Sequence, residues 1–252
     1  MNPNFAQNNW PTIKAAIEGD NQPVVALLPC GATEAHGPHL PLSTDVIISE
    51  GQCAYAQPTL DEAGIKAFTL PSIAYAPADY AGNFAGTISI SSDTAKAVII
   101  DIASSLKKQG FSALAIANSH FDPDNVTMLR EVVETIRAEV GLPVAYPDFT
   151  RRKLAETLTD EFKSGACHAG QYETSLVMAS RPELVDEVAR MRAKDNPKSL
   201  IEGFKQGATN FEECGGPEAY FGFPSKATVA EGVQSYEILA AALVESIKSA
   251  LR

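Results

Sequence analysis

Three short apolar runs constrain the fold of this chain more than any other feature. The runs are PVVALLP at 23–29, FSALAIAN at 111–118 and LPVAYPD at 142–148. Apolar runs of this length, without polar alternation, suit strands that are buried on both faces. Longer segments with helical spacing separate them, and strands that alternate with helices form a mainly parallel sheet with helices on both faces. We therefore predict an α/β fold with a central, mainly parallel β-sheet flanked by helices.

The sequence also marks where helices begin and end. Residues 91–110 begin with Ser and Asp, carry two Lys in the last turn and end at Gly110, which predicts a helix. Further helices are expected over residues 45–58, 124–140, 151–163, about 165–180 and 228–251. Residues 65–75 predict one or two strands interrupted by Pro71. The polar segment 185–223 follows no pattern that predicts an element.

Length and composition fit one domain. The chain has 252 residues, of which 45% are hydrophobic and 20% are charged, an ordinary globular composition. A chain of this size buries a large core without disulfides or a structural metal. Because no repeat, low-complexity tract or linker divides the sequence, we expect a single domain over residues 1–252.

Charge and cysteine content exclude several classes of function. The net charge of −11 argues against a partner such as nucleic acid or a membrane surface. No apolar run approaches the ~18 residues of a membrane span. None of the four Cys forms a CxxC pair, and the N-terminus shows no secretory signal. We expect a cytoplasmic protein with reduced cysteines.

Two loops that follow apolar runs carry most of the chemistry. The stretch GATEAHGPHLPLSTD at 31–45 follows the first run and contains Glu34, His36, His39 and Asp45. The stretch SHFDPDN follows the second run and contains His120 and Asp122. The carboxyl ends of parallel strands meet at one edge of a sheet, where sites collect, so we expect the two loops to face one another.

The four histidines support this interpretation. They are His36, His39, His120 and His168, and each has a carboxylate within five residues in a loop punctuated by Gly or Pro. Glu34 and His36 point to one side of an extended segment, and Pro123 favours the same arrangement for His120 and Asp122. Mixed imidazole and carboxylate ligands suit zinc, manganese or iron.

Asp45 decides how many metals such a set would hold. Together with the two pairs it makes five ligands, more than one tetrahedral zinc needs. A bridging Asp45 lets them serve two metals ~3.5 Å apart with a hydroxide between them. The alternative is that Asp45 binds no metal and serves only as the N-cap of the following helix. Asp124 is expected to belong to a helix-entry turn.

These residues resemble the creatininase (creatinine amidohydrolase) family. GATEAHGPHLPLSTD is similar to its signature loop, and three later segments are similar to family motifs in the same order: AGTISIS, CHAGQYETSLVMASRPELV and FPSKATVAEG. The resemblance extends from about residue 24 to residue 245. It implies the creatininase-like α/β fold, a hydrolase site with two divalent metals and a homohexamer. Zinc is the first choice of metal, and manganese or iron are the alternatives.

The resemblance also implies roles for single residues. Four of them fall on metal ligands, with Asp45 as the bridge: Glu34, His36, Asp45 and His120. Asp122 stands where creatininase has a ligand Glu and is one methylene shorter, and we include it in the expected ligand set. His168 falls on the proton-handling His, and Glu173 matches a carboxylate at the start of the following helix, so both are expected to be catalytic. Gln171 replaces a frequent Glu, and His39 is expected to brace the loop.

The expected activity is metal-dependent hydrolysis of a carbon–nitrogen bond, other than a peptide bond, in a small cyclic or formylated amide. A water between two metals would attack the carbonyl, and His168 would relay a proton to the leaving nitrogen. Creatinine amidohydrolase proper and formamidopyrimidine-nucleotide deformylase are alternative activities. The resemblance makes creatinine itself a less favourable substrate, because the only Trp, Trp10, lies in the N-terminal segment and Phe121 replaces a Tyr of true creatininases.

Other classes of function are weighed against the hydrolase. A non-catalytic protein could bind a small ligand on the same scaffold, and a lyase or isomerase could use one metal. Cys167 beside His168 suggests a thiol nucleophile, but adjacent residues in an extended chain point to opposite sides.

Overall fold

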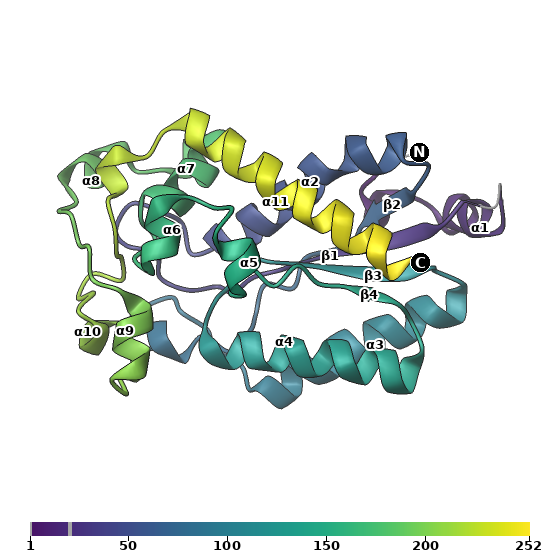
Figure 1. Cartoon of the computed structure of the whole chain (residues 1–252), viewed down its shortest axis with the longest axis horizontal. Helices are drawn as coiled ribbons and strands as arrows, with labels where there is room; N and C mark the ends of the chain where they lie inside the picture. The colour runs from purple at the N-terminus through teal and green to yellow at the C-terminus, as the bar shows by residue number, and fades with distance from the viewer. Residues whose placement is uncertain (1, 20–21) are drawn as a thin grey trace.

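A four-stranded parallel sheet forms the centre of the computed structural model, which describes residues 2–19 and 22–252 (Figure 1). Its strands are β1 (Val24–Cys30), β2 (Lys66–Thr69), β3 (Ala113–Asn118) and β4 (Val144–Ala145), in the order β2-β1-β3-β4. Each neighbouring pair of strands is parallel. The predicted α/β fold with a parallel sheet is confirmed.

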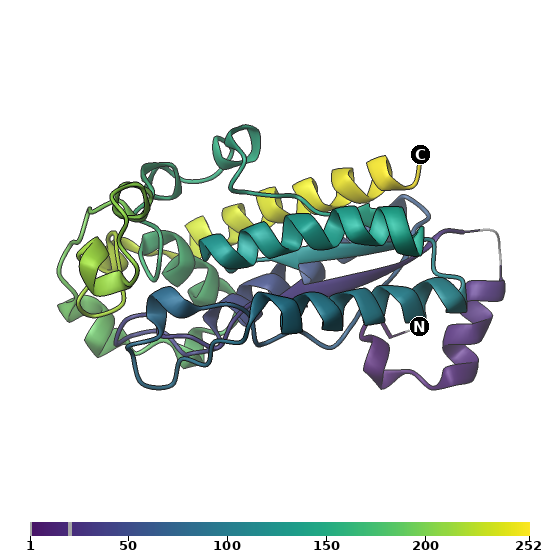
Figure 2. The same ribbon diagram turned by 90° about the horizontal axis from the view of Figure 1, so that it is seen from below.

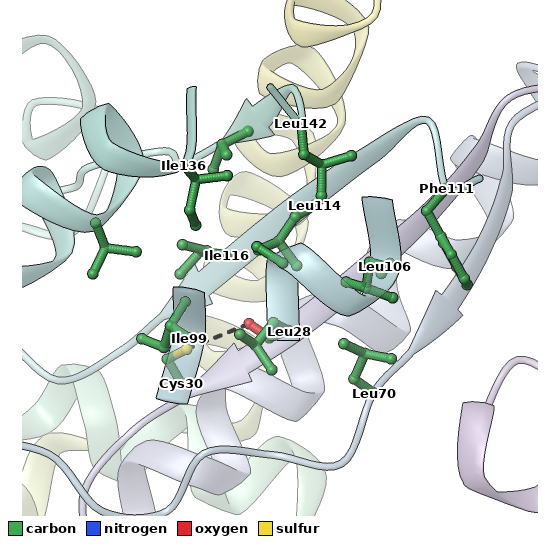
Figure 3. Packing of buried hydrophobic residues seen from close by; sticks show 14 of the residues in the cluster. Leu28, Cys30, Leu70, Ile99, Leu106, Phe111, Leu114, Ile116, Ile136 and Leu142 are labelled. Atoms are coloured by element: carbon green, nitrogen blue, oxygen red, sulfur yellow. Dashed lines mark hydrogen bonds between the residues drawn. The ribbon is translucent and has the colours of Figure 1, made fainter. Parts of the chain in front are cut away.

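Helices cover both faces of the sheet. They are α1 (Trp10–Glu18), α2 (Thr44–Glu62), α3 (Ser92–Gln109), α4 (Pro123–Thr135) and α11 (Val229–Ala250). Successive side chains of a strand point to opposite faces. Val24 and Leu28 of β1 therefore join the core with α1, α3 and α4, part of which Figure 3 shows. Val25 and Leu27 join the core with α2 and α11. In Figure 2, α3 and α4 lie side by side in front of the sheet.

Six short helices gather beyond the carboxyl ends of β1 and β3. They are α5 (Arg152–Ala155), α6 (Asp160–Ser164), α7 (Gln171–Ser180), α8 (Glu187–Arg192), α9 (Leu200–Lys205) and α10 (Phe211–Cys214). Figure 1 shows α6 to α10 at the end of the molecule opposite to the two chain termini. Ala35 and Leu40, from the loop after β1, pack among apolar residues of these helices. This end of the molecule therefore encloses the loop that carries the signature residues.

Prolines explain why two strands are shorter than the sequence indicates. The strand expected over 142–148 is reduced to Val144–Ala145, with Pro143 before it and Pro147 after it. The strand expected within 65–75 ends at Thr69, before Pro71. Proline has no N–H to donate to the ladder of a sheet, so both strands end near one.

Most helices lie where they were expected. In α3 the Ser91 hydroxyl accepts the N–H of Thr94, and Gly110 ends the helix with φ 96°. The helix expected over 151–163 is wrong as a single element, because Thr159 is extended and caps a second helix, α6. The unassigned segment 185–223 contains α8, α9 and α10. Among the described residues, no helix combines the length and apolarity that a bilayer span requires.

Candidate metal centre

Glycine at position 31 lets the loop after β1 fold against the start of α2. A Cβ at Gly31 would lie 2.7 Å from both the Cβ of Asp45 and the backbone N of Val46, too close for any side chain. The next residue, Ala32, donates its N–H to Asp45 Oδ2 at 3.2 Å. Asp45 is in the first turn of α2, so this contact brings its carboxylate under the loop that carries Glu34 and His36.

His120 reaches the same place from the neighbouring strand. Cys30 and Asn118, the last residues of β1 and β3, pair in the parallel ladder. The side-chain amides of Asn118 and Asn125 donate to the carbonyl of His120 at 2.8 and 2.9 Å, which fixes the backbone of this residue. As expected from the topology, the two loops face one another.

The start of α7 supplies two further side chains. Ala169 adopts the left-handed conformation with φ 50°, and its N–H donates to Glu173 Oε2 at 2.6 Å. The carbonyl of His168 accepts the N–H of Phe221 at 2.8 Å. This sharp turn between His168 and α7 directs both His168 and Glu173 toward the loop after β1.

The six side chains form one buried cluster: Glu34, His36, Asp45, His120, His168 and Glu173. Asp45 Oδ1 lies 3.1 Å from His36 Nε2, and Asp45 Oδ2 lies 3.0 Å from His120 Nδ1. Glu34 Oε1 lies 3.1 Å from the same His120 nitrogen. Glu173 Oε2 lies 3.6 Å from His36 Nε2. Asp45 thus offers a different oxygen to each of two imidazoles.

Hydrogen bonds on the outer side of each ring indicate which nitrogen carries the proton. His36 Nδ1, His120 Nε2 and His168 Nε2 lie 3.1, 2.6 and 2.9 Å from the carbonyls of Glu34, Pro77 and Ala35. A carbonyl only accepts, so these outer nitrogens donate. A neutral ring then turns the lone pair of its inner nitrogen toward carboxylate oxygens.

Such an arrangement fits a cation between the rings and the carboxylates. Among the described residues, His36 Nε2 has no hydrogen-bond partner although it is fully buried. A lone pair that faces a carboxylate repels it, whereas a metal ion accepts electron density from both groups. The backbone carbonyl behind each ring is the usual second partner of a metal-bound histidine.

Donor atoms within 4.8 Å of one another form three groups that could hold an ion. They are Glu34–Asp45–His120, His36–Asp45–Glu173 and Glu34–His36–His168. The first two share Asp45 and otherwise use different residues. Two neighbouring ions joined by Asp45 are therefore compatible with the donor set, and its mixture of nitrogen and oxygen suits zinc, manganese or iron.

The pKa shifts reflect the excess of buried carboxylates. Burial alone lowers the pKa of His36, but the charges of Asp45, Glu173 and Glu34 outweigh it and raise the pKa to about 10. Burial raises the pKa of Glu173 to about 8. Burial alone raises the pKa of Asp45, but His36 and His120 outweigh burial and bring this pKa well below its ordinary value. This cluster attracts positive charge, whether protons or metal ions.

Asp122 and His39 lie beside the cluster rather than in its ligand groups. Asp122 Oδ1 accepts the N–H of Asp124 at 2.9 Å and caps α4. Its buried Oδ2 has no hydrogen-bond partner among the described residues, and burial raises the pKa of Asp122 to about 6. His39 Nε2 lies 3.0 Å from Thr174 Oγ1 and links the loop to α7, a bracing contact of the kind expected.

The structure also bears on Cys167 and reveals Glu161. Burial raises the pKa of Cys167 well above its usual value, which disfavours the thiolate that a nucleophile needs.

Glu161 on α6 accepts the N–H groups of Gln171 and Tyr172, at 2.8 and 2.7 Å, and that of Phe223 at 2.7 Å. It holds the start of α7, and no local motif in the sequence distinguishes it from other charged helix residues.

A cavity of ≈ 470 Å³ opens from the cluster. Among the residues that line it are Glu34, Asp45, His120, Asp122, His168 and Glu173. The predicted site residues other than His36 therefore share one cavity, and His36 lies directly behind them with an exposure of 0%. A small molecule that enters this cavity meets the acidic cluster at its base.

Comparison with known proteins places these features in a family. The family model for creatinine amidohydrolase matches residues 6–247. The mycofactocin precursor peptide peptidase of Mycolicibacterium smegmatis (strain ATCC 700084 / mc(2)155) is 27% identical, over 89% of this chain and 84% of its own. The creatinine amidohydrolase of Pseudomonas putida is 27% identical, over 70% of this chain and 71% of its own. The structure of a manganese creatininase superposes with a TM-score of 0.77 at 20% identity, over 99% and 98% of the two chains.

Proposed function

The chain belongs to the creatinine amidohydrolase family, and from this premise we propose that it is a hydrolase that uses two divalent metal ions to cleave the carbon–nitrogen bond of an amide. The observation that carries the proposal is the position of Asp45, which directs one oxygen toward His36 and the other toward His120. A carboxylate shared in this way joins two ligand groups.

We assign the ligands from these groups. One ion would be held by Glu34, Asp45 and His120, and the other by His36, Asp45 and Glu173. This assignment gives Glu173 the ligand position that the sequence suggested for Asp122. When bound, such ions supply Lewis acidity and lower the pKa of water toward neutrality. Zinc, manganese and iron all suit these donors.

His168 is the group that we propose to handle the proton. Its Nε2 lies 2.9 Å from the carbonyl of Ala35, and its Nδ1 faces Glu34 Oε1 at 3.9 Å. Burial, followed by the charge of His36, lowers the pKa of His168 to about 4. The imidazole is then neutral at pH 7, and its Nδ1 carries a lone pair that can accept a proton. It would accept a proton and pass it to the leaving nitrogen.

Two kinds of substrate follow from the relatives. The first is a small cyclic or formylated amide, by analogy with the creatinine amidohydrolase of Pseudomonas putida. The second is a peptide bond, by analogy with the mycofactocin precursor peptide peptidase. The cavity of ≈ 470 Å³ lies within the range of ~300–1,000 Å³ that is usual for small-molecule sites, so its volume accommodates either substrate. A homohexamer and a cytoplasmic location remain predictions.

A hydrolysis screen tests the proposal. The protein is loaded with zinc or manganese and incubated with creatinine, N-formyl amino acids and dipeptides, and products are weighed by mass spectrometry. We expect at least one amide to yield products that together gain the mass of water, with activity lost in Asp45→Asn and in a chelator. Metal binding without hydrolysis of any amide would favour a ligand-binding protein. A product that lacks the added water would favour a lyase or isomerase.

A further inference from the structure

The cavity above the candidate metal centre runs from a buried base to an open end. Glu34, Asp45 and His120 at the base are 1–3% exposed. Other lining side chains are partly exposed: Arg130 by 38%, Lys163 by 40% and Ile201 by 48%. This gradient shows that part of a bound molecule can extend from the cluster toward solvent.

Aromatic rings from separate segments line the cavity between these ends. Phe121, from the loop after β3, meets Phe162 of α6 edge to face with ring centroids 5.6 Å apart. Phe211 of α10 lies beside His168, with centroids 4.4 Å apart, and Phe204 of α9 contacts Tyr80 at 4.5 Å. We call the space lined by Phe121, Phe149, Phe162, Phe204 and Phe211 the aromatic channel.

Three polar groups that line the channel, those of Arg130, Lys163 and Tyr80, already have partners within the protein. Arg130 is paired with Asp148 at 2.8 Å and Lys163 with Asp160 at 2.6 Å. The Tyr80 hydroxyl donates to the carbonyl of Ala208 at 2.9 Å. Since these groups are satisfied within the protein, the channel favours an occupant that buries apolar surface rather than a charged one.

We propose that the aromatic channel binds a bulky apolar group of the substrate, an aromatic or branched aliphatic side chain attached next to the scissile amide. The inference rests on the proposed function, because the cluster must hold the amide for its neighbour to enter the channel. It narrows the substrate class to amides with such a side chain and sets small ring amides aside. Affinity then grows with the apolar area that the substrate buries.

Hydroxamic acids test the channel without requiring turnover. Their head group chelates metal ions, so acetohydroxamic acid probes the centre alone and 3-phenylpropionohydroxamic acid adds an aromatic tail. Binding of each to the zinc-loaded full chain is measured by calorimetry. We expect the tailed compound to bind at least tenfold more tightly. Ala155, on α5, lines the channel, so Ala155→Trp should reduce this advantage to less than threefold and leave acetohydroxamic acid within twofold of the wild type.

A matched control lies on the same short helix. Lys153 is exposed and does not line the channel, so Lys153→Trp should keep the tenfold advantage. If Ala155→Trp does not fold, Phe204→Ala carries the test, with an expected loss of at least fivefold for the tailed compound only. Equal affinity of both compounds for the wild type would overturn the channel and leave the metal centre intact. An advantage of the tailed compound that is unchanged in both Ala155→Trp and Phe204→Ala would do the same. If neither compound nor zinc binds, the proposed function falls and the channel falls with it.

Discussion

Asp45 shows how single residues define this site. It is 1% exposed, yet it has two imidazoles within 3.1 Å and one N–H from Ala32. Two further carboxylates, of Glu34 and Glu173, lie in the same cluster. Removing several carboxylates from water is costly unless positive charge compensates them. The proposed pair of divalent ions would supply that charge.

Glu173 and Asp122 can be distinguished by substitution. Glu173 belongs to one of the groups that could hold an ion and Asp122 belongs to none of them, whereas the sequence predicts Asp122 as a ligand and Glu173 as catalytic. We expect Glu173→Gln to lower the metal content by about one ion per chain. Asp122→Asn should keep the metal content of the wild type, because its Oδ1 caps α4 and, among the described residues, no group that could hold an ion includes it. Elemental analysis of both variants checks this, and equal losses in the two would contradict the assignment.

His39 makes stability depend on pH. Burial, followed by the charge of His36, lowers the pKa of His39 from 6.5 to about 4. Between these values the unfolded chain binds a proton that the folded chain does not, so stability falls as the pH drops from 6.5 to 4. His39→Gln keeps a partner for Thr174 but cannot titrate. The free energy of unfolding, measured with urea between pH 4 and 6.5, should change less steeply with pH in the variant, by the equivalent of up to one bound proton. Identical slopes in the two proteins would refute this role.

At the level of elements, α7 is held between the site and α11. Glu173 extends from one turn of α7, and Ser175 on the same helix lies against Gly232 of α11. A Cβ at position 232 would come within 1.9 Å of the Ser175 carbonyl oxygen, which only glycine avoids. Glu161 holds the first turn of the same helix through two of its backbone N–H groups. The position of Glu173 therefore depends on packing contacts remote in sequence.

Gly232→Ala should disturb this packing. We expect a loss of ~1–3 kcal/mol in the free energy of unfolding, the usual cost of an added methyl group in a well-packed interface. Ala241→Ser, at an exposed position of the same helix, is the control and should stay within ~0.5 kcal/mol of the wild type. Urea denaturation of both variants measures the difference. A Gly232→Ala protein as stable as its control would show that α7 and α11 can separate without cost.

For the whole molecule, the sequence predicts the parts that local patterns determine. The strands β1 and β3 follow from apolar runs, and four of the six cluster residues lie in the segments that follow them: Glu34, His36, Asp45 and His120. The strand expected over 142–148 is cut to two residues by flanking prolines. Glu161 and helices α8 to α10 depend on contacts between distant segments, which no local pattern encodes. The position of Glu173 in the cluster depends on the turn at Ala169, whose φ of 50° cannot be read from the sequence.

The central claim is that the cluster holds two divalent ions joined by Asp45. The most direct test is the metal content of gently purified protein, measured by mass spectrometry beside an Asp45→Asn variant. The account predicts about two zinc, manganese or iron ions per chain in the wild type and a loss of both in the variant, because both ligand groups include Asp45. A wild-type protein that binds no metal even after reconstitution, or a variant that retains two ions, would contradict it.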